Sequence, residues 1–163
     1  MKIVIDPFDK KSIARAEEMV RQYKKDFEGK EQEFCRRLAE IGVSVASAGF
    51  AIADYDGVKD VTVSIQKTDG GYAVVASGET VGFIEFGTGV RYPEWDSSGM
   101  EYVPPAHGTY GKGQGKNPWG WWFKQNDGGA AKHTYGNMPA EALRTARDRM
   151  IERVTSIARE VWR

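Results

Sequence analysis

Few residues in this sequence have the types and spacing that chemistry requires, and most of them lie in the middle of the chain. The segment from Gly111 to Asn117 contains two Gly-Lys pairs. A phosphate-binding loop needs a glycine five residues before its Gly-Lys pair and a Ser or Thr directly after it, to bend the backbone around phosphate and to ligate magnesium. Tyr110 and Asn117 occupy those two positions. We therefore interpret the segment as a flexible loop and expect no nucleotide cofactor.

Metal ligation and acid–base catalysis find little support in the spacing of the candidate side chains. His107 and His133 are the only histidines and Cys35 is the only cysteine, which leaves no third ligand at a metal-site spacing. Four carboxylates near the tryptophans could pair for glycoside hydrolysis: Glu85, Glu94, Asp96 and Glu101. We predict no catalytic residue, no metal and no cofactor, and keep a carbohydrate-binding or glycoside-cleaving domain as the alternative.

Glu85 differs from the other carboxylates because apolar residues surround it in the run 81–86, directly before Gly87, Thr88 and Gly89. A carboxylate in apolar surroundings needs hydrogen-bond donors. The N–H groups of Gly87, Thr88 and Gly89 are the nearest in sequence. We expect Glu85 to be structural and to hold this turn in place.

Residues 87–136 combine many glycines with many aromatic residues, because they hold 11 of the 19 glycines and four of the five tryptophans. Each large ring left in water forgoes roughly 1.5–3 kcal/mol of transfer free energy. The rings therefore need a surface to cover them, either in this domain or on a neighbouring molecule. We predict that six of them contact other proteins: Tyr92, Trp95, Tyr102, Tyr110, Trp119 and Trp122. The alternation over 119–123 predicts a strand that places Trp122 on the face opposite Trp119, Trp121 and Phe123.

Helical periodicity dominates the first third of the chain. Asp9 is a plausible N-cap, and apolar residues follow at spacings of three and four from Ile13 to Phe27 and again from Phe34 to Ile52. The stripe shifts phase between the two runs, where Gly29 lies. One rod over residues 9–53 would be about 67 Å long. We therefore expect two helices, or one helix whose N-terminal part projects from the body.

After residue 57 the apolar period becomes twofold. Residues 61–66 alternate between apolar and polar, 68–71 have turn chemistry, and 72–77 are again β-prone, which predicts a hairpin. Residues 81–86 could form a third strand. A last helix is predicted from Met138, with Pro139 in its first turn.

Composition and charge limit the function classes. The 163 residues fit one domain, and 23 basic residues balance 23 acidic ones, so no net field attracts nucleic acid or an anionic membrane. No apolar run is long enough to span a bilayer, and residues 1–11 lack a signal-peptide pattern. We expect a cytosolic product with no nucleic-acid motif and no membrane partner.

Several motifs resemble the head–tail joining, or tail-completion, family of long-tailed bacteriophages. They are the run from Val81 to Val90 with its Glu-Phe-Gly-Thr-Gly core, the segment 107–111, the aromatic cluster 119–123, and the segments 133–136 and 139–143. The resemblance implies a non-enzymatic virion protein of a phage or prophage, made in the bacterial cytoplasm and working in a ring. Its implied partners are other copies of itself and phage head-completion, tail-terminator or tail-tube proteins.

The expected fold is a single α+β domain over residues 1–163. Residues 9–54 would be helical, residues 58–136 would form a small antiparallel sheet with an extended loop rich in glycine and aromatic residues, and residues 139–162 would form a C-terminal helix. By the same resemblance, that last helix packs on the sheet.

Overall fold

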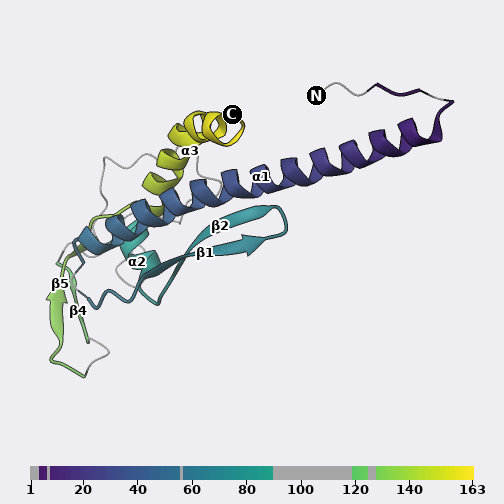
Figure 1. Cartoon of the computed structure of the whole chain (residues 1–163). Helices are drawn as coiled ribbons and strands as arrows, with labels where there is room; N and C mark the ends of the chain where they lie inside the picture. The colour runs from purple at the N-terminus through teal and green to yellow at the C-terminus, as the bar shows by residue number, and fades with distance from the viewer. Residues whose placement is uncertain (1–3, 7, 56, 90–118, 125–127) are drawn as a thin grey trace.

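Helix α1 (Lys10–Ile52) runs along the whole molecule, and the other elements gather around its C-terminal half (Figure 1). This computed structural model describes residues 4–6, 8–55, 57–89, 119–124 and 128–163. Strands β1 (Thr62–Thr68) and β2 (Gly71–Ser77) form a hairpin beside α1. The short helix α2 (Val81–Phe86) follows, and the long helix α3 (Ala142–Val161) ends the fold. The expected α+β class is confirmed.

The sequence of α1 explains where it begins and why it continues past Gly29. Asp9 caps the helix, because its carboxylate accepts a hydrogen bond from the backbone N–H of Lys11 at 2.9 Å. The helix has no break at Gly29, so the expectation of two helices is wrong and the alternative of one helix with a projecting N-terminal part holds (Figure 1). Ion pairs one turn apart, Arg21 with Glu17 and Lys24 with Glu28, support the projecting part.

Gly29 offers a test of this continuous helix. Nothing lies within 4 Å of the position where a Cβ would be built on Gly29. Glycine in a helix interior costs about 0.5–1 kcal/mol relative to alanine. We expect Gly29→Ala to raise the free energy of unfolding, measured by urea denaturation, by about that amount. Gly42→Ala is the matched control, because its Cβ would lie 2.6 Å from Met150 Sδ and 2.7 Å from Val74 Cγ2. A loss of stability in Gly29→Ala would show that the chain needs a bend there.

The predicted hairpin is confirmed, and the predicted third strand is wrong. Strands β1 and β2 pair antiparallel from Thr62↔Ser77 to Thr68↔Gly71. Residues 81–86 form α2 instead of a strand. Asp60 provides the physical reason: its carboxylate accepts hydrogen bonds from the backbone N–H groups of Glu79 at 2.6 Å and Thr80 at 3.0 Å, and also from the Thr80 hydroxyl. These bonds hold the chain in a turn that leads from β2 directly into a helix.

The last helix begins later than predicted and packs on a different partner. It starts at Ala142, so Pro139 lies before the helix rather than in its first turn. Glu141 takes a left-handed conformation (φ 47°) between them. Helix α3 packs mainly against α1, not on a sheet as expected. Gly49 lets the two helices approach closely, because it has no Cβ. A Cβ built on Gly49 would lie only 2.8 Å from the Ala142 Cβ.

The core lies where α1, α2 and α3 meet. Five buried apolar residues form it: Ala46, Phe50, Ile84, Ala142 and Ala146. The described residues also form two further short antiparallel pairs of strands. Strand β3 (Thr88–Gly89) pairs with β6 (Gly136–Asn137), and β4 (Trp121–Phe123) pairs with β5 (Lys132–Thr134). In the described part of the chain, no helix is long and apolar enough to cross a membrane.

Candidate functional site

Glu85 connects α2 to the start of α3. Its side chain is buried, and the two carboxylate oxygens accept hydrogen bonds from the backbone N–H of Leu143 at 3.1 and 3.0 Å. Oε1 also accepts from the N–H of Arg144 at 3.2 Å. The expectation that Glu85 holds its own turn, Gly87 to Gly89, is therefore corrected. Glu85 is structural, but it caps a helix that begins 57 residues later in the sequence.

Helix α3 needs this distant cap because its own N-cap residue cannot supply one. Glu141 makes no side-chain cap hydrogen bond in its left-handed conformation. The N–H groups of the first helical turn would otherwise lack acceptors in a buried place. Burial raises the pKa of the Glu85 carboxyl, although the hydrogen bonds from Leu143 and Arg144 act in the opposite direction.

The carbonyl groups at the end of α2 are satisfied by the segment that precedes α3. The Asn137 amide donates to the Phe83 carbonyl at 3.0 Å, and the Ala140 N–H donates to the Ile84 carbonyl at 2.8 Å. The Glu141 N–H donates to the Glu85 carbonyl at 3.2 Å. The end of α2 thus supplies an acceptor for the N–H groups at the start of α3, and the segment before α3 supplies donors for the carbonyl groups at the end of α2. We call this set of contacts between residues 83–89 and 137–144 the polar junction.

Thr88 and Gly87 complete the polar junction. The Thr88 hydroxyl lies 2.5 Å from Asn137 Oδ1 and accepts from the Asn137 N–H at 3.3 Å. Gly87 has φ 70° and ψ 167°, a region that only glycine populates readily. A Cβ on Gly87 would lie 2.7 Å from the Pro139 nitrogen. All four residues predicted to be structural therefore belong to the polar junction or continue from it into β3: Glu85, Gly87, Thr88 and Gly89.

The described residues on either side of segment 90–118 are both attached to residues 133–137. Gly89 pairs with Gly136 in the β3–β6 ladder. On the other side, His133 Nε2 lies 2.9 Å from the carbonyl oxygen of Trp119, and β4 pairs with β5. The polar junction in turn fixes residues 137–144 to α2. The chain on both sides of segment 90–118 therefore starts from one hydrogen-bonded base, formed by residues 133–137 and their partners.

An exposed group of rings lies on this base. Trp119 is 81% exposed, Trp122 69% and Tyr135 62%. His133 lies between two of them, with its ring centroid 5.2 Å from that of Trp122 and 4.9 Å from that of Tyr135, both in edge-on geometry. We call these four residues the aromatic surface. Such contacts restrict the rings in advance, which lowers the entropy lost when a partner covers them.

The aromatic surface confirms part of the predicted strand and corrects the rest. Trp121 and Phe123 are half-buried and Trp122 is exposed, as the alternation predicts. Trp119 lies before the strand and is exposed rather than buried. Tyr135 was not predicted as a contact residue. Side chains two residues apart in an extended chain point to the same face, so Tyr135 lies on the same face as His133. Tyr92, Trp95, Tyr102 and Tyr110 lie outside the described residues.

The histidines and carboxylates considered for metal binding and for glycoside cleavage either have other partners or lie outside the described residues. No three of their His, Cys, Asp and Glu side chains could hold a metal ion. Of the four carboxylates considered for glycoside cleavage, Glu85 is occupied by the cap, and Glu94, Asp96 and Glu101 lie outside the described residues. His133 serves the aromatic surface, and His107 lies outside the described residues.

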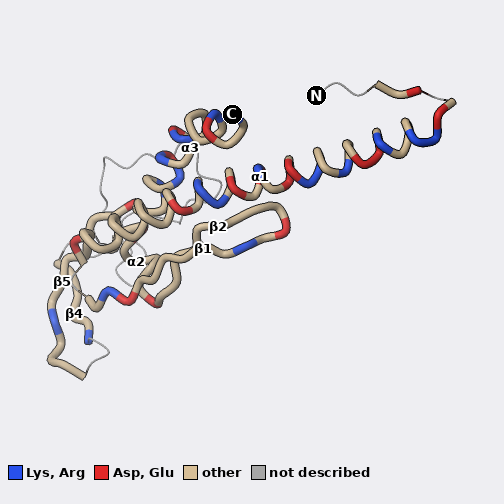
Figure 2. The backbone as a smooth tube through the Cα atoms, in the orientation of Figure 1, with Lys and Arg blue, Asp and Glu red and all other residues tan. Residues whose placement is uncertain are grey.

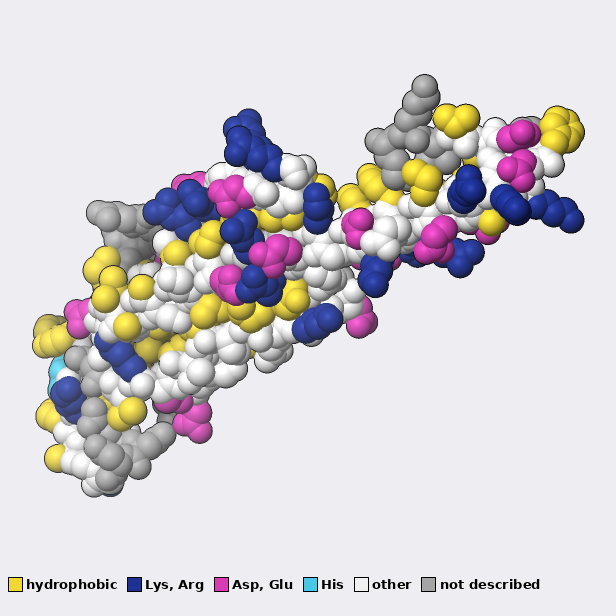
Figure 3. All heavy atoms as spheres, in the orientation of Figure 1, with side chains coloured by type: hydrophobic (Ala, Val, Ile, Leu, Met, Phe, Trp, Pro, Cys, Tyr) yellow, Lys and Arg dark blue, Asp and Glu magenta, His cyan; other side chains and the backbone are white. Residues whose placement is uncertain are grey.

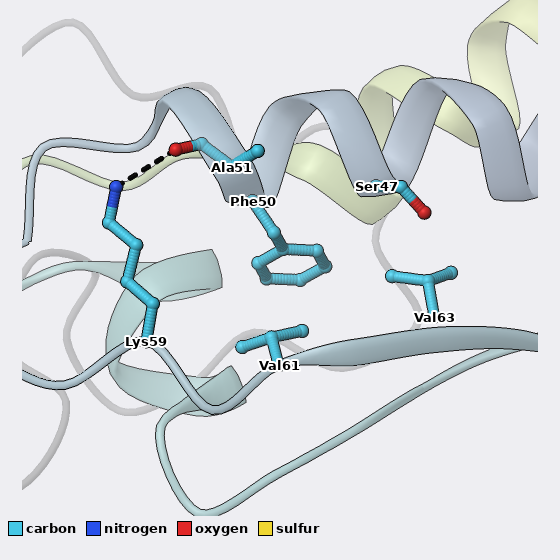
Figure 4. Close-up of a pocket in the computed structure, with 6 residues that line it drawn as sticks. All are labelled: Ser47, Phe50, Ala51, Lys59, Val61 and Val63. Atoms are coloured by element: carbon cyan, nitrogen blue, oxygen red, sulfur yellow. Dashed lines mark hydrogen bonds between the residues drawn. The ribbon is translucent and has the colours of Figure 1, made fainter.

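A small pocket of about 210 Å³ lies between the end of α1 and strand β1 (Figure 4). Phe50, Val61 and Val63 provide its apolar wall, and Lys59 lies at its edge. The Lys59 ammonium donates to the Ala51 carbonyl at 2.9 Å, where it satisfies a group at the C-terminal end of α1. Because its lysine is occupied and its other described walls are mostly apolar, we interpret the pocket as imperfect packing.

Comparison of the chain with models of protein families, with curated proteins and with solved structures found no match.

Proposed function

We propose that this chain is a non-enzymatic structural protein of a phage or prophage virion, acting at the head–tail junction through ring-type assembly. One observation carries the proposal: Trp119, Trp122 and Tyr135 are exposed on strands and adjoining residues that backbone pairing and hydrogen bonds connect to the polar junction. The motifs that resemble the tail-completion family support it, because the two that are furthest apart in the sequence, 81–90 and 139–143, both contribute residues to that junction.

The energetics of the aromatic surface suit protein–protein contact. Tryptophan and tyrosine are enriched among the residues that dominate binding energy, often at more than about 2 kcal/mol each. Rings on a soluble monomer are seldom exposed in groups without an interaction role. Among the described residues of β4, β5 and their immediate neighbours, the charged side chains are Lys124 and Lys132 (Figure 2). A partner that covers the rings would therefore not force them against a carboxylate of these strands.

The proposed partners are other copies of the chain and phage head-completion, tail-terminator or tail-tube proteins. The chain would be made in the bacterial cytoplasm and would then become part of the virion. A formal net charge of zero agrees with contacts to proteins rather than to nucleic acid.

Complementation of a phage that lacks this gene tests the proposal. The wild-type gene should restore infectious particles, and Trp119→Ala combined with Trp122→Ala should leave separate heads and tails in electron micrographs. Ile151→Ala is the control, because Ile151 is also exposed (62%) but lies on α3. Heads and tails that join normally in the absence of the gene would contradict the proposal. Glycan binding lost in Trp122→Ala, with assembly intact, would support the carbohydrate alternative instead.

A further inference from the structure

The projecting part of α1 carries an apolar stripe that the rest of the chain covers only in part: Ala16 is buried, whereas the larger apolar residues around it are partly exposed. Hydrophobic side chains line one side of this rod and charged side chains the other (Figure 3). Five large residues form the stripe, and they are 39–56% exposed: Ile13, Met19, Val20, Tyr23 and Phe27. The stripe ends at Trp162 near the C-terminus of α3, whose ring centroid lies 6.3 Å from that of Phe27.

We propose that this stripe binds the same stripe of a second copy, with the two α1 helices antiparallel. Five large residues that are about half exposed leave on the order of 500 Å² of mainly apolar surface per copy. Two copies then cover roughly 1,000 Å² of apolar surface, and the charged flanks bring the total to the size of a stable interface, about 1,200–2,000 Å². Apolar patches of several hundred Å² mark interaction sites on soluble proteins.

Charge decides the direction of the two helices. In an antiparallel pair centred between Val20 and Tyr23, Glu17 of each copy faces Lys24 of the other, which gives two opposite-charge contacts. Both side chains are available, because the Glu17 side chain is 61% exposed and that of Lys24 is 76% exposed. In a parallel pair, Asp26 would instead face Glu31 of the second copy, a repulsive contact. Flanking charges select the orientation of paired helices in this way.

Residues near the N-terminus agree with this arrangement. Ile5, which is itself 53% exposed, lines a shallow groove together with Ile13, Ala16 and Val20 of the stripe. It therefore widens the apolar surface available to the second helix. This contact is separate from the aromatic surface and does not rest on the proposed function. Its failure would leave the complementation result unchanged.

Sedimentation velocity of the purified full chain over a concentration series tests the pairing. We expect the wild type to form dimers and Val20→Glu to weaken them at least about tenfold, because it places a charge in the middle of both stripes. Lys25→Glu is the control, since Lys25 lies on the helix face opposite Val20. Circular dichroism checks that each variant keeps its helices. A wild-type monomer at the highest concentration reached, or a dimer that Val20→Glu leaves intact, overturns the proposal.

A charge reversal tests the direction of the helices. Glu17→Lys and Lys24→Glu should each weaken the dimer on the order of three- to tenfold, and the double variant should recover it. Within one copy, Glu17 pairs with Arg21 and Lys24 with Glu28. Each single variant makes one of these pairs like-charged, and the double variant makes both of them like-charged. Recovery therefore reports only a contact between copies. A double variant as weak as the singles overturns the antiparallel arrangement.

Discussion

Glu85→Ala is expected to lower the free energy of unfolding by about 3 kcal/mol, because it removes the acceptor of buried N–H groups at the start of α3. Glu85 is only 4% exposed, so water cannot replace the carboxylate without opening the junction. Urea denaturation at pH 7 measures the loss. Glu152→Ala on the same helix is the control, since its ion pair with Arg149 is exposed and should matter by less than about 1 kcal/mol. A change of a few tenths of a kcal/mol in Glu85→Ala would contradict the capping role.

The dependence on pH separates the charge of Glu85 from its hydrogen bonds. Burial raises the pKa of Glu85 in the folded state above its ordinary value of 4.5, so the folded protein binds this proton more tightly than the unfolded chain does. This tighter proton binding contributes to the free energy of unfolding. The contribution is fully present below pH 4.5 and is lost as the pH rises through the raised pKa of the folded state. Glutamine does not titrate. The stability advantage of the wild type over Glu85→Gln should therefore be greater near pH 4 than near pH 7. An advantage that grows with pH would mean that the hydrogen bonds outweigh burial.

Elements with a regular period over many residues were predictable, and short ones were not. The spacing over Ile13–Phe27 and Phe34–Ile52 correctly predicted helix, although not whether it formed one helix or two, and the alternation over 61–66 correctly predicted a strand. The six residues of α2 carry no such signal, because a short apolar run fits a buried strand as well as a helix. Asp60, some 20 residues before α2, settles the choice through the turn that it holds. An interaction between separated segments is not visible in a local pattern.

The same limit explains the partial success with Glu85. Its apolar neighbours correctly indicated a buried carboxylate that needs donors. The nearest donors in sequence were the wrong ones, because the left-handed conformation of Glu141 leaves α3 without a local cap. Pro139 was placed inside the helix for a related reason. Proline has no N–H and therefore suits the first helical turn. It suits equally well its actual position before α3, where the chain passes close to Gly87.

For the aromatic surface, the sequence identified residues but not their arrangement. Trp122 was correctly placed on the face opposite Trp121 and Phe123. The edge-on contacts of His133 with Trp122 and Tyr135 depend on the pairing of β4 with β5 across an intervening segment. His133 gave no such signal, because an isolated histidine in a glycine-rich region is compatible with many roles.

Gly87→Ala is expected to lower the free energy of unfolding by about 2–4 kcal/mol. Two costs combine at this position. The backbone conformation, φ 70° and ψ 167°, is one that residues with a Cβ rarely adopt. The new Cβ would also lie 2.7 Å from the Pro139 nitrogen and 2.8 Å from the Asn137 carbonyl oxygen. Both are backbone atoms, so no side-chain rotation relieves the overlap.

Gly70→Ala is the matched control for this substitution, because Gly70 lies in the β1–β2 turn with nothing within 4 Å of the added Cβ. Urea denaturation should find it within about 0.5 kcal/mol of the wild type. Amide exchange adds a local test. Relief of the overlap must separate residues 87–89 from 137–139, so the amide of Asn137, which donates to the Thr88 hydroxyl, should lose protection in Gly87→Ala. If stability and Asn137 protection both stay at the wild-type level, the close approach at Gly87 does not hold the junction together, and the residues beneath the aromatic surface are held in place by other contacts.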